Sequence, residues 1–428
     1  MLANNNLGAL SRHYIILVFF HFFLIYMVLG SGKSSFFNAY FISNLEIIFI
    51  VSYTLLNLTK ISQLSSYIKE HRSTLIILML WVFSVLYSYF SSPLYTEQNT
   101  YMSSRLLQTF THVALFFTIW HYLKNTEIKL SYLFYTIVFS TVLVAIYFYY
   151  YWINSMGFGF GETLNDPPLN SHVRHTGYQV GAALSFFFIF LIRNCIKQDI
   201  TFTHILASIF LWGFLFWLGG RGAILSAFVS FLCIVFILKY RNIKFSNIVK
   251  ITMLSILAGM LLSELLVVYP WNGIIDSYQR SISAESITQL STGRITIWIA
   301  ALESLKGNFI FGLGPQGFYL MENTIKGLVQ PHNVFIQFLV EWGIVGTSLF
   351  LLLLIKATWA GIKLHILNKD NYISPTALAA GAVICTLSVN ALTDGTYYHP
   401  QPSVYLAIAF AIWVLPAMDA DVHQKKSE

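Results

Sequence analysis

Long apolar stretches recur along the whole chain and are separated by shorter polar connections. Most stretches hold nearly twenty residues, the length of helix that crosses a hydrocarbon core about 30 Å thick. They lack the two-residue alternation of membrane β-strands, and a helix satisfies its own backbone groups in lipid. We therefore predict an all-α polytopic membrane protein with about twelve spans, near residues 14–30, 36–56, 74–90, 106–123, 130–152, 176–192, 203–218, 223–238, 248–268, 344–362, 375–392 and 403–416.

Composition supports this class. Hydrophobic residues make up 56% of the 428 residues and charged residues only 10%, whereas about a quarter of the residues of a soluble protein are charged. The three cysteines lie within or beside spans and lack metal-like spacing, so we expect neither a disulfide framework nor a zinc site. The first apolar stretch has no small-residue cleavage site behind it, which favours a retained helix over a signal peptide.

Lysine and arginine are distributed unevenly between the two sides of the membrane. If the loops alternate from a cytoplasmic N-terminus, seventeen of the 25 basic residues fall on the cytoplasmic side and eight on the other. Basic residues in short loops mark the cytoplasmic side, so we predict that both termini are cytoplasmic. This topology accounts for the net charge of +7 without a nucleic-acid partner.

Three outer connections stand apart from the short ones. The longest covers residues 269–331, between spans nine and ten, and a smaller excursion covers residues 154–175. The third joins the last two spans through residues 394–400. Long loops without spans of their own are usually functional or disordered. We treat residues 1–428 as a single integral membrane domain and 269–331 as a long periplasmic loop with short amphipathic helices, and we expect function on the outer face.

Two arginines on that face have distinctive settings. Arg221 lies in a tight Gly-Gly-Arg-Gly-Ala hairpin, where the flanking glycines permit close approach of a ligand. Arg294 opens a predicted amphipathic helix, in which Trp298, Leu302 and Leu305 share one face. We expect this helix to lie flat at the membrane surface. The structural alternative for both is an arginine that anchors a helix end at the interface. Because arginine gives phosphate two fixed donors, we predict that both bind an anionic headgroup.

His332 follows a proline and is predicted to open a helix on the same face. A helix N-terminus disfavours imidazolium, and a neutral imidazole accepts a proton from a hydroxyl. A polar cap at the interface is the structural alternative. Asn333 is a candidate to fix the ring or a substrate, and Glu341 to brace the helix. Weaker candidates on this face are Arg174, His175 and Asp394.

The residues do not indicate a metal site or cofactor. No outer cluster of carboxylates offers the oxygen ligands that Mg²⁺ requires, and no Ser, His and Asp occur at a meaningful spacing. Asp419 and Asp421 form an Asp-x-Asp pair, but they follow the last span on the cytoplasmic side. The remaining candidates describe a site that binds an anionic lipid headgroup and deprotonates a neutral acceptor.

The order of these motifs resembles the O-antigen ligase and polymerase superfamily of bacterial inner membranes. The resemblance covers roughly the second half of the chain and is strongest at residues 332–346, which are similar to a His-Asn…Glu-x-Gly-x-x-Gly pattern. It implies a Gram-negative inner-membrane glycosyltransferase of the GT-C type. The implied donor is an undecaprenyl-pyrophosphate-linked O-antigen, and the acceptor is a sugar hydroxyl of the lipid A core. The implied reaction inverts the anomeric centre without a metal, with the pyrophosphate on Arg221 and Arg294 and the acceptor activated by His332.

Other functions stay open at this point. Polymerases use a second lipid-linked glycan as acceptor, and protein O-oligosaccharyltransferases, whose chains are commonly longer, use serine or threonine. The long loop before His332 favours a ligase. A polysaccharide or lipid transporter or flippase is the non-enzymatic alternative, with a binding site near the midplane. Glu46 and Glu264 lie within spans without an obvious cationic partner, and an ion pair at either would favour a transporter.

Overall fold

The computed structural model describes residues 39–57, 71–95, 99–124, 130–155, 173–197, 202–268, 272–321, 330–368 and 374–415. Throughout these ranges the ordered elements are helices, and none is a strand, which confirms the all-α prediction. The first predicted span, most of the excursion at 154–175, and Asp419 with Asp421 lie outside the described residues.

Each predicted span from the second onward coincides with one long helix. Six helices are long and apolar enough to cross a membrane, and three shorter apolar ones accompany them among the described residues. The total of twelve spans stays a prediction. The long helices are α2 (Ala39–Leu56), α4 (Arg72–Phe90), α5 (Asn99–Lys124), α6 (Leu130–Ser155), α7 (Val173–Lys197), α8 (Phe202–Trp217), α9 (Arg221–Tyr240), α10 (Ser246–Leu265), α15 (Val334–Gly361), α16 (Pro375–Ala391) and α17 (Pro400–Trp413).

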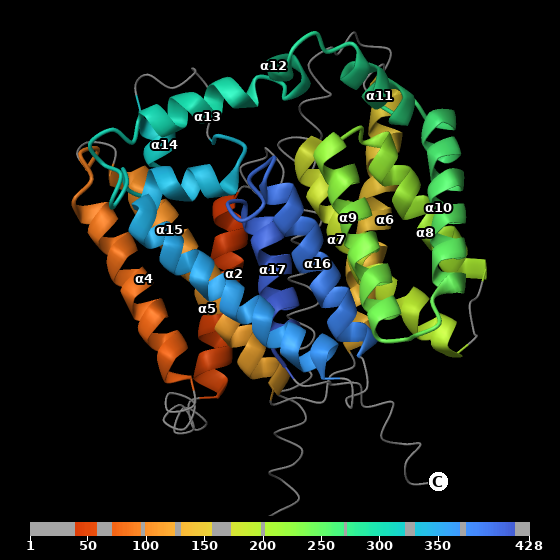
Figure 1. Ribbon diagram of the computed structural model, residues 1–428, viewed down its shortest axis with the longest axis horizontal. Helices are drawn as coiled ribbons and strands as arrows, with labels where there is room; N and C mark the ends of the chain where they lie inside the picture. Colours follow the sequence, from red (N-terminus) through yellow and green to blue (C-terminus); the bar gives the residue numbers. More distant parts are fainter. Residues whose placement is uncertain are drawn as a thin grey trace, which may run out of the picture.

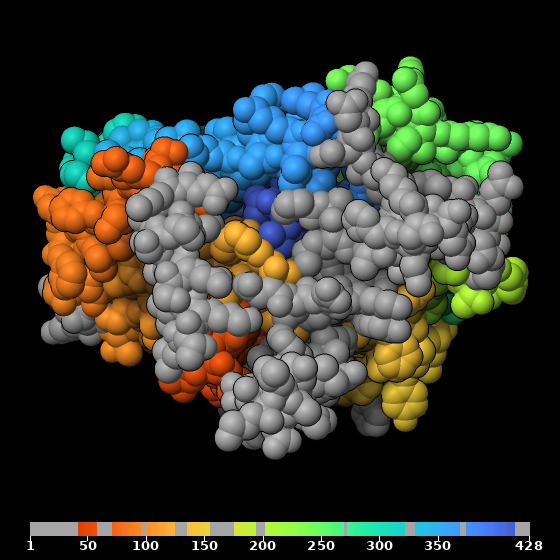
Figure 2. Space-filling model, turned by 90° about the horizontal axis from the view of Figure 1, so that it is seen from below, coloured from red at the N-terminus to blue at the C-terminus, as the bar shows by residue number. Residues whose placement is uncertain are grey.

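Helices α7, α16 and α17 form the centre of the bundle (Figure 1). Every residue of α17 is buried, and α16 packs against α7, α9 and α17. Small side chains on α16, such as Ala379 and Ala380, let its neighbours approach closely, as is common between membrane helices. Figure 2 shows the same order from below, with blue C-terminal segments between the orange segments and the green ones. Outer helices expose apolar side chains such as Leu232 and Phe236, as expected for a surface that faces lipid.

Helices α2 and α5 are joined by a series of polar contacts. Ser43 contacts Gln108 at 3.2 Å, and nearer the other end Tyr53 contacts His121 at 2.7 Å. The paired positions advance together, so the two helices run parallel, as expected if one crossing, α4, lies between them. Between these contacts the fully buried Glu46 pairs with His112 Nδ1 at 2.8 Å. The sequence offered no obvious cationic partner for Glu46, and its contact in the structure is a histidine on a helix distant in sequence.

The described part of the long loop folds into short helices across one end of the bundle (Figure 1). They are α11 (Ile274–Ile282), α12 (Ile287–Leu290), α13 (Arg294–Glu303) and α14 (Gly317–Leu320). Glu264, at the end of α10, accepts hydrogen bonds from the first two amides of α11 at 2.6 and 3.1 Å. Helix α11 leaves Ile275, Tyr278 and Ile282 exposed at helical spacing, a pattern typical of a helix at a lipid surface.

Helix α13 differs from its predicted orientation. Its buried side chains are Ile297 and Ala301, which pack with Leu305 on the segment that leads to α14 and on α15. Leu302 is exposed, and the half-buried Trp298 turns its indole towards Pro331. The three residues predicted to share one face therefore differ in their surroundings: Leu302 is exposed, whereas Trp298 and Leu305 contact other parts of the protein.

Helix α15 is broken at Gly343, whose φ is 63° (Figure 1). The segment at 309–314 enters the break and pairs with the freed backbone. Leu313 and Gly314 donate to the carbonyls of Val340 and Glu341 at 2.8 and 2.9 Å, and Ile344 donates to Phe309 at 2.9 Å. An ideal Cβ at residue 343 would lie 2.3 Å from a backbone oxygen, so only glycine fits there. The break leaves the first part of α15 at the end of the bundle that carries α11–α14, with the π-helical η4 (Ile362–Leu367) at the far end.

Candidate functional site

His332 lies just before α15 and contacts the loop between α16 and α17. Its Nδ1 is 3.1 Å from Asp394 Oδ1, with side-chain exposures of 18% and 6%. An ionised carboxylate only accepts hydrogen bonds, so in the neutral ring this contact places the proton on Nδ1. Nε2 then has a lone pair and, among the described residues, no hydrogen-bond partner. The pair has the geometry of a general base and the carboxylate that orients it.

The helix begins at Val334, two residues after the histidine that the sequence predicts to open it. Asn333 is the N-cap, and its Oδ1 accepts from the amides of Phe335 and Ile336 at 3.0 and 3.1 Å. Its Nδ2 donates to the carbonyl of Leu392 at 3.1 Å, which ties the helix to the end of α16. His332 adopts a left-handed φ of 53° outside the helix. Asn333 therefore caps α15 and positions its backbone, whereas Asp394 contacts the imidazole ring of His332.

Two further histidines lie close to this pair. His399 is buried, its Nε2 accepts from Gln330 Nε2 at 2.9 Å, and its ring centroid is 4.3 Å from that of His175. Burial lowers the pKa of His399 well below 6.5, with contributions from nearby His175, Arg105 and His332 that outweigh Asp394. His399 is therefore a neutral ring at pH 7. The loop at 394–399 brings Asp394 and His399 to one place on the molecule.

Helix α13 connects Arg294 to the histidine. Arg294 is its first residue, and Trp298, one turn later, donates from Nε1 to the carbonyl of Pro331 at 2.8 Å. Pro331 directly precedes His332. This hydrogen bond fixes the N-terminal turn of α13 beside the start of α15, so a group bound by Arg294 would lie on the same end of the bundle as His332.

Arg221 is the first residue of α9 and is held by the long loop. Its Nη1 donates to Ser281 Oγ at 3.1 Å, and its Nη2 donates to the carbonyl of Leu290 at 3.0 Å. Leu290 ends α12, which is separated from Arg294 by three residues. The structure thus joins Arg221, Arg294 and His332 through one continuous set of loop contacts, although 111 residues separate the first from the last.

Glu341 lies at the break in α15 and is 1% exposed. Its Oε1 accepts from Gln337 Nε2 at 3.0 Å and from the Tyr398 hydroxyl at 2.8 Å. Arg105 stacks over the Tyr398 ring, 3.0 Å from its centroid. Glu341 therefore joins α15 to other segments, in addition to the bracing role expected within its own helix.

Sequence reasoning passed over several residues of this region. They are Arg105, Gln330, Tyr398 and His399. Tyr398 and His399 lie in the short outer loop already noted for Asp394, which was the one available signal. Arg174 is within α7, but its side chain lies outside the described residues.

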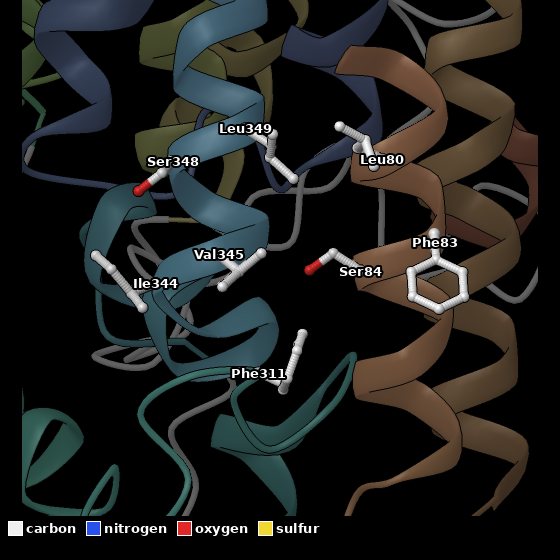
Figure 3. Close-up of a pocket in the computed structure, with 8 residues that line it drawn as sticks. All are labelled: Leu80, Phe83, Ser84, Phe311, Ile344, Val345, Ser348 and Leu349. Atoms are coloured by element: carbon white, nitrogen blue, oxygen red, sulfur yellow. The ribbon is translucent and has the colours of Figure 1, made fainter. Parts of the chain in front are cut away.

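Two apolar grooves open beside the long loop. One, of about 530 Å³, runs between α9 and α11 and includes Arg221, Leu225 and Phe228. The other, of about 540 Å³, lies between α4 and α15 at the helix break. Figure 3 shows Ser84 of α4 facing Val345 across this second groove, with Phe311 at one end. Each groove has the dimensions and lining to accept part of a hydrocarbon chain.

The described residues contain no group of three or more His, Cys, Asp or Glu side chains that could hold a metal ion. The side chains described above that are candidates for chemistry are His332, Asp394 and the two arginines.

Comparison with known proteins bears on the same region. Residues 206–351 match the sequence profile of the family described as O-antigen ligase. This range includes Arg221, Arg294, His332 and Glu341, and it ends before Asp394. A search of curated proteins found no match. The profile match confirms the predicted resemblance to the O-antigen ligase superfamily over residues 206–351.

Proposed function

We propose that this protein is an O-antigen ligase that transfers a glycan from a polyprenyl-pyrophosphate carrier to a sugar hydroxyl of a lipid A core. The family match supports a polysaccharide-assembling membrane enzyme in general. The observation that carries the proposal is the His332–Asp394 pair at 3.1 Å, on the same end of the bundle as Arg221 and Arg294. A base beside two fixed cations suits a reaction between a hydroxyl and a diphosphate-activated sugar.

In the proposed reaction the acceptor oxygen attacks the anomeric carbon opposite the leaving group. The new C–O bond forms as the bond to the pyrophosphate oxygen breaks, which inverts the centre. His332 Nε2 takes the proton of the acceptor hydroxyl, and the resulting imidazolium is stabilised by Asp394. The electron pair of the broken bond stays on the pyrophosphate, where Arg221 and Arg294 bind the developing charge. Atoms and charge balance without a metal or cofactor.

The groove below Arg221 suits the carrier lipid. It is lined by apolar side chains of α9 and α11 and has the guanidinium at its edge. A polyprenyl chain in this groove would leave its pyrophosphate beside Arg221 and next to α12. The donor would then enter sideways from the membrane, with the long loop above its headgroup.

Purified protein with a lipid-linked glycan and a lipid A-core acceptor tests the proposal. His332→Ala should abolish transfer while the protein stays folded. His204→Ala is the matched control, because His204 begins α8 at the opposite end from the Arg221 hairpin. Transfer retained by His332→Ala would overturn the assigned base.

Lipopolysaccharide electrophoresis of a deletion strain separates the related functions. Loss of attached O-antigen with accumulation of lipid-linked polymer supports a ligase. A single repeat unit on the core supports a polymerase, and normal lipopolysaccharide contradicts both. Transfer to a protein serine or threonine would identify a protein O-oligosaccharyltransferase.

The Glu46–His112 pair favours one second candidate, a transporter or flippase. An ionisable pair within the membrane is a common feature of substrate or proton pathways. The carboxylate is fully buried between α2 and α5, apart from His332 in sequence. Glu46→Gln discriminates the two functions: an enzyme keeps glycan transfer in detergent, whereas a transporter loses lipid translocation in vesicles.

A further inference from the structure

We propose that Glu341, Tyr398 and Arg105 form a positioning network that sets the contact between His332 and Asp394. The inference rests on the proposed function, since it assigns these three residues to the same reaction. None of them touches the reacting atoms. They act through the two segments that carry the base and its carboxylate.

The geometry of these two segments is the first observation. His332 lies just before the first part of α15, and Glu341 lies near the end of that part, before the break at Gly343. Asp394 and Tyr398 lie four residues apart in the loop before α17. The His332–Asp394 and Glu341–Tyr398 contacts, at 3.1 and 2.8 Å, thus join the same two segments at two points. A two-point attachment fixes the relative orientation of two segments, which one hydrogen bond alone does not.

Asn333 adds a third connection between the same parts of the chain, through its hydrogen bond to the carbonyl of Leu392 at 3.1 Å. It lies at the His332 end of the helix, whereas Glu341 lies at the other end. Loss of the Glu341–Tyr398 contact would therefore free the Glu341 end of the first part of α15, while Asn333 would still hold the His332 end. We expect altered positioning rather than unfolding.

Arg105 provides the charge that a buried carboxylate requires. It is 8% exposed, stacks over the Tyr398 ring, and acts electrostatically on Glu341. Gln108, one turn along α5, accepts a hydrogen bond from the guanidinium and fixes its direction. Burying a carboxylate without a partner costs several kcal/mol, so the cation and the Tyr398 hydroxyl stabilise Glu341 together.

The Tyr398 hydroxyl is also 2.5 Å from Gln316 Oε1, at the start of α14. Burial raises the pKa of Tyr398 well above 10, so the phenol keeps its proton and acts as a donor. The backbone carbonyl of Glu341 accepts from Ser88 Oγ of α4 at 2.6 Å. The network therefore contacts α4, α5 and the long loop. These contacts hold Tyr398, and with it the loop that carries Asp394, in a fixed position.

The test is a double-mutant cycle with Tyr398→Phe and Asp394→Asn, read as kcat and KM for glycan transfer. Tyr398→Phe removes one hydroxyl and keeps the ring under Arg105. It should lower kcat about tenfold in the wild-type background, leave both KM values within about twofold, and alter the pH profile of kcat. In the Asp394→Asn background it should have almost no further effect, because the contact that it positions is already lost.

Tyr397→Phe is the matched control. It removes a hydroxyl from the adjacent residue, where the partner is Ser388 at 2.8 Å on α16. This variant should leave kcat and its pH profile unchanged. Glu341→Gln, which keeps the shape of the side chain, should reproduce the Tyr398→Phe effect if it accumulates in the membrane.

The outcomes distinguish this inference from the proposed function. If Tyr398→Phe lowers kcat equally in both backgrounds, or in neither, the positioning role is overturned. Glycan transfer by the wild type would still support the ligase. An Asp394→Asn variant with full activity would also overturn the positioning role, because the contact that the network sets would then not matter. A wild-type protein that does not transfer glycan would instead contradict the proposed function on which the cycle depends.

Discussion

Asp394 Oδ1 lies 3.1 Å from His332 Nδ1, although the two residues are 62 positions apart in the chain and α15, η4 and α16 lie between them. The contact joins the start of α15 to the loop that follows α16, at the end of the bundle that carries the long loop.

The first prediction concerns that carboxylate. Asp394→Asn should lower kcat about 10²-fold or more, because a neutral amide neither selects the Nδ1–H tautomer reliably nor stabilises the imidazolium. KM for donor and acceptor should change little. Steady-state transfer assays with the purified variant provide the measurement. An Asp394→Asn protein with wild-type kcat would show that His332 does not depend on this partner.

The arginines should act on the donor. Arg221→Lys and Arg294→Lys should each raise KM for the lipid-linked glycan about tenfold, because lysine keeps the charge but lacks the two-donor fork for phosphate. Arg241→Lys, at the opposite end of α9, is the control and should behave as wild type. If the lysine variants alter only the KM of the acceptor, the assignment of both arginines to the donor is wrong.

His399 should make the protein sensitive to acid. Its folded-state pKa lies well below 6.5, so the unfolded chain binds the proton first as pH falls. Stability contributed by this group is complete above about pH 6.5 and decreases as pH falls towards the folded-state pKa, by at most about 1.4 kcal/mol per pH unit. His399→Gln should flatten this dependence, measured as the apparent Tm in detergent between pH 7 and 5. An unchanged slope would mean that other groups dominate.

The break in α15 should tolerate no side chain. Gly343→Ala meets both a positive φ and the Ile310 backbone oxygen at 2.3 Å, so we expect loss of folded protein in the membrane. Gly307→Ala is the matched comparison, because Gly307 also has a positive φ, of 90°, but no atom within 4 Å. It should cost only about 1–2 kcal/mol. Fluorescence size-exclusion of tagged variants measures both, and equal yields would contradict the close packing at the break.

The apolar pattern of the sequence was sufficient to predict the helices. From α2 to α17 each predicted span coincides with one long helix; most ends differ by a few residues, but α5 and α15 begin seven and ten residues earlier than predicted. The physical reason is local: a stretch of about twenty apolar residues in lipid has to satisfy its own backbone groups. The order of Arg221, Arg294 and His332 was likewise visible, because charged residues are rare in such a chain.

Partners across the fold were not visible in the same way. The sequence indicated Asp394 only as a weak candidate and did not pair it with His332, and it missed Arg105, Tyr398 and the Glu46–His112 pair. The packing of α13 was not visible either, because Leu302 and Ala301 are neighbours on the helix and only packing against α15 decides which one is buried.

The sequence by itself thus determined the helical membrane class and the residue types available for chemistry, since both depend on local composition. Only the tertiary structure decided which carboxylate meets His332 and which segments hold it. Such contacts depend on the rotation and depth of helices far apart in the chain, and on the entry of residues 309–314 into the break at Gly343. Local hydropathy does not encode these relationships.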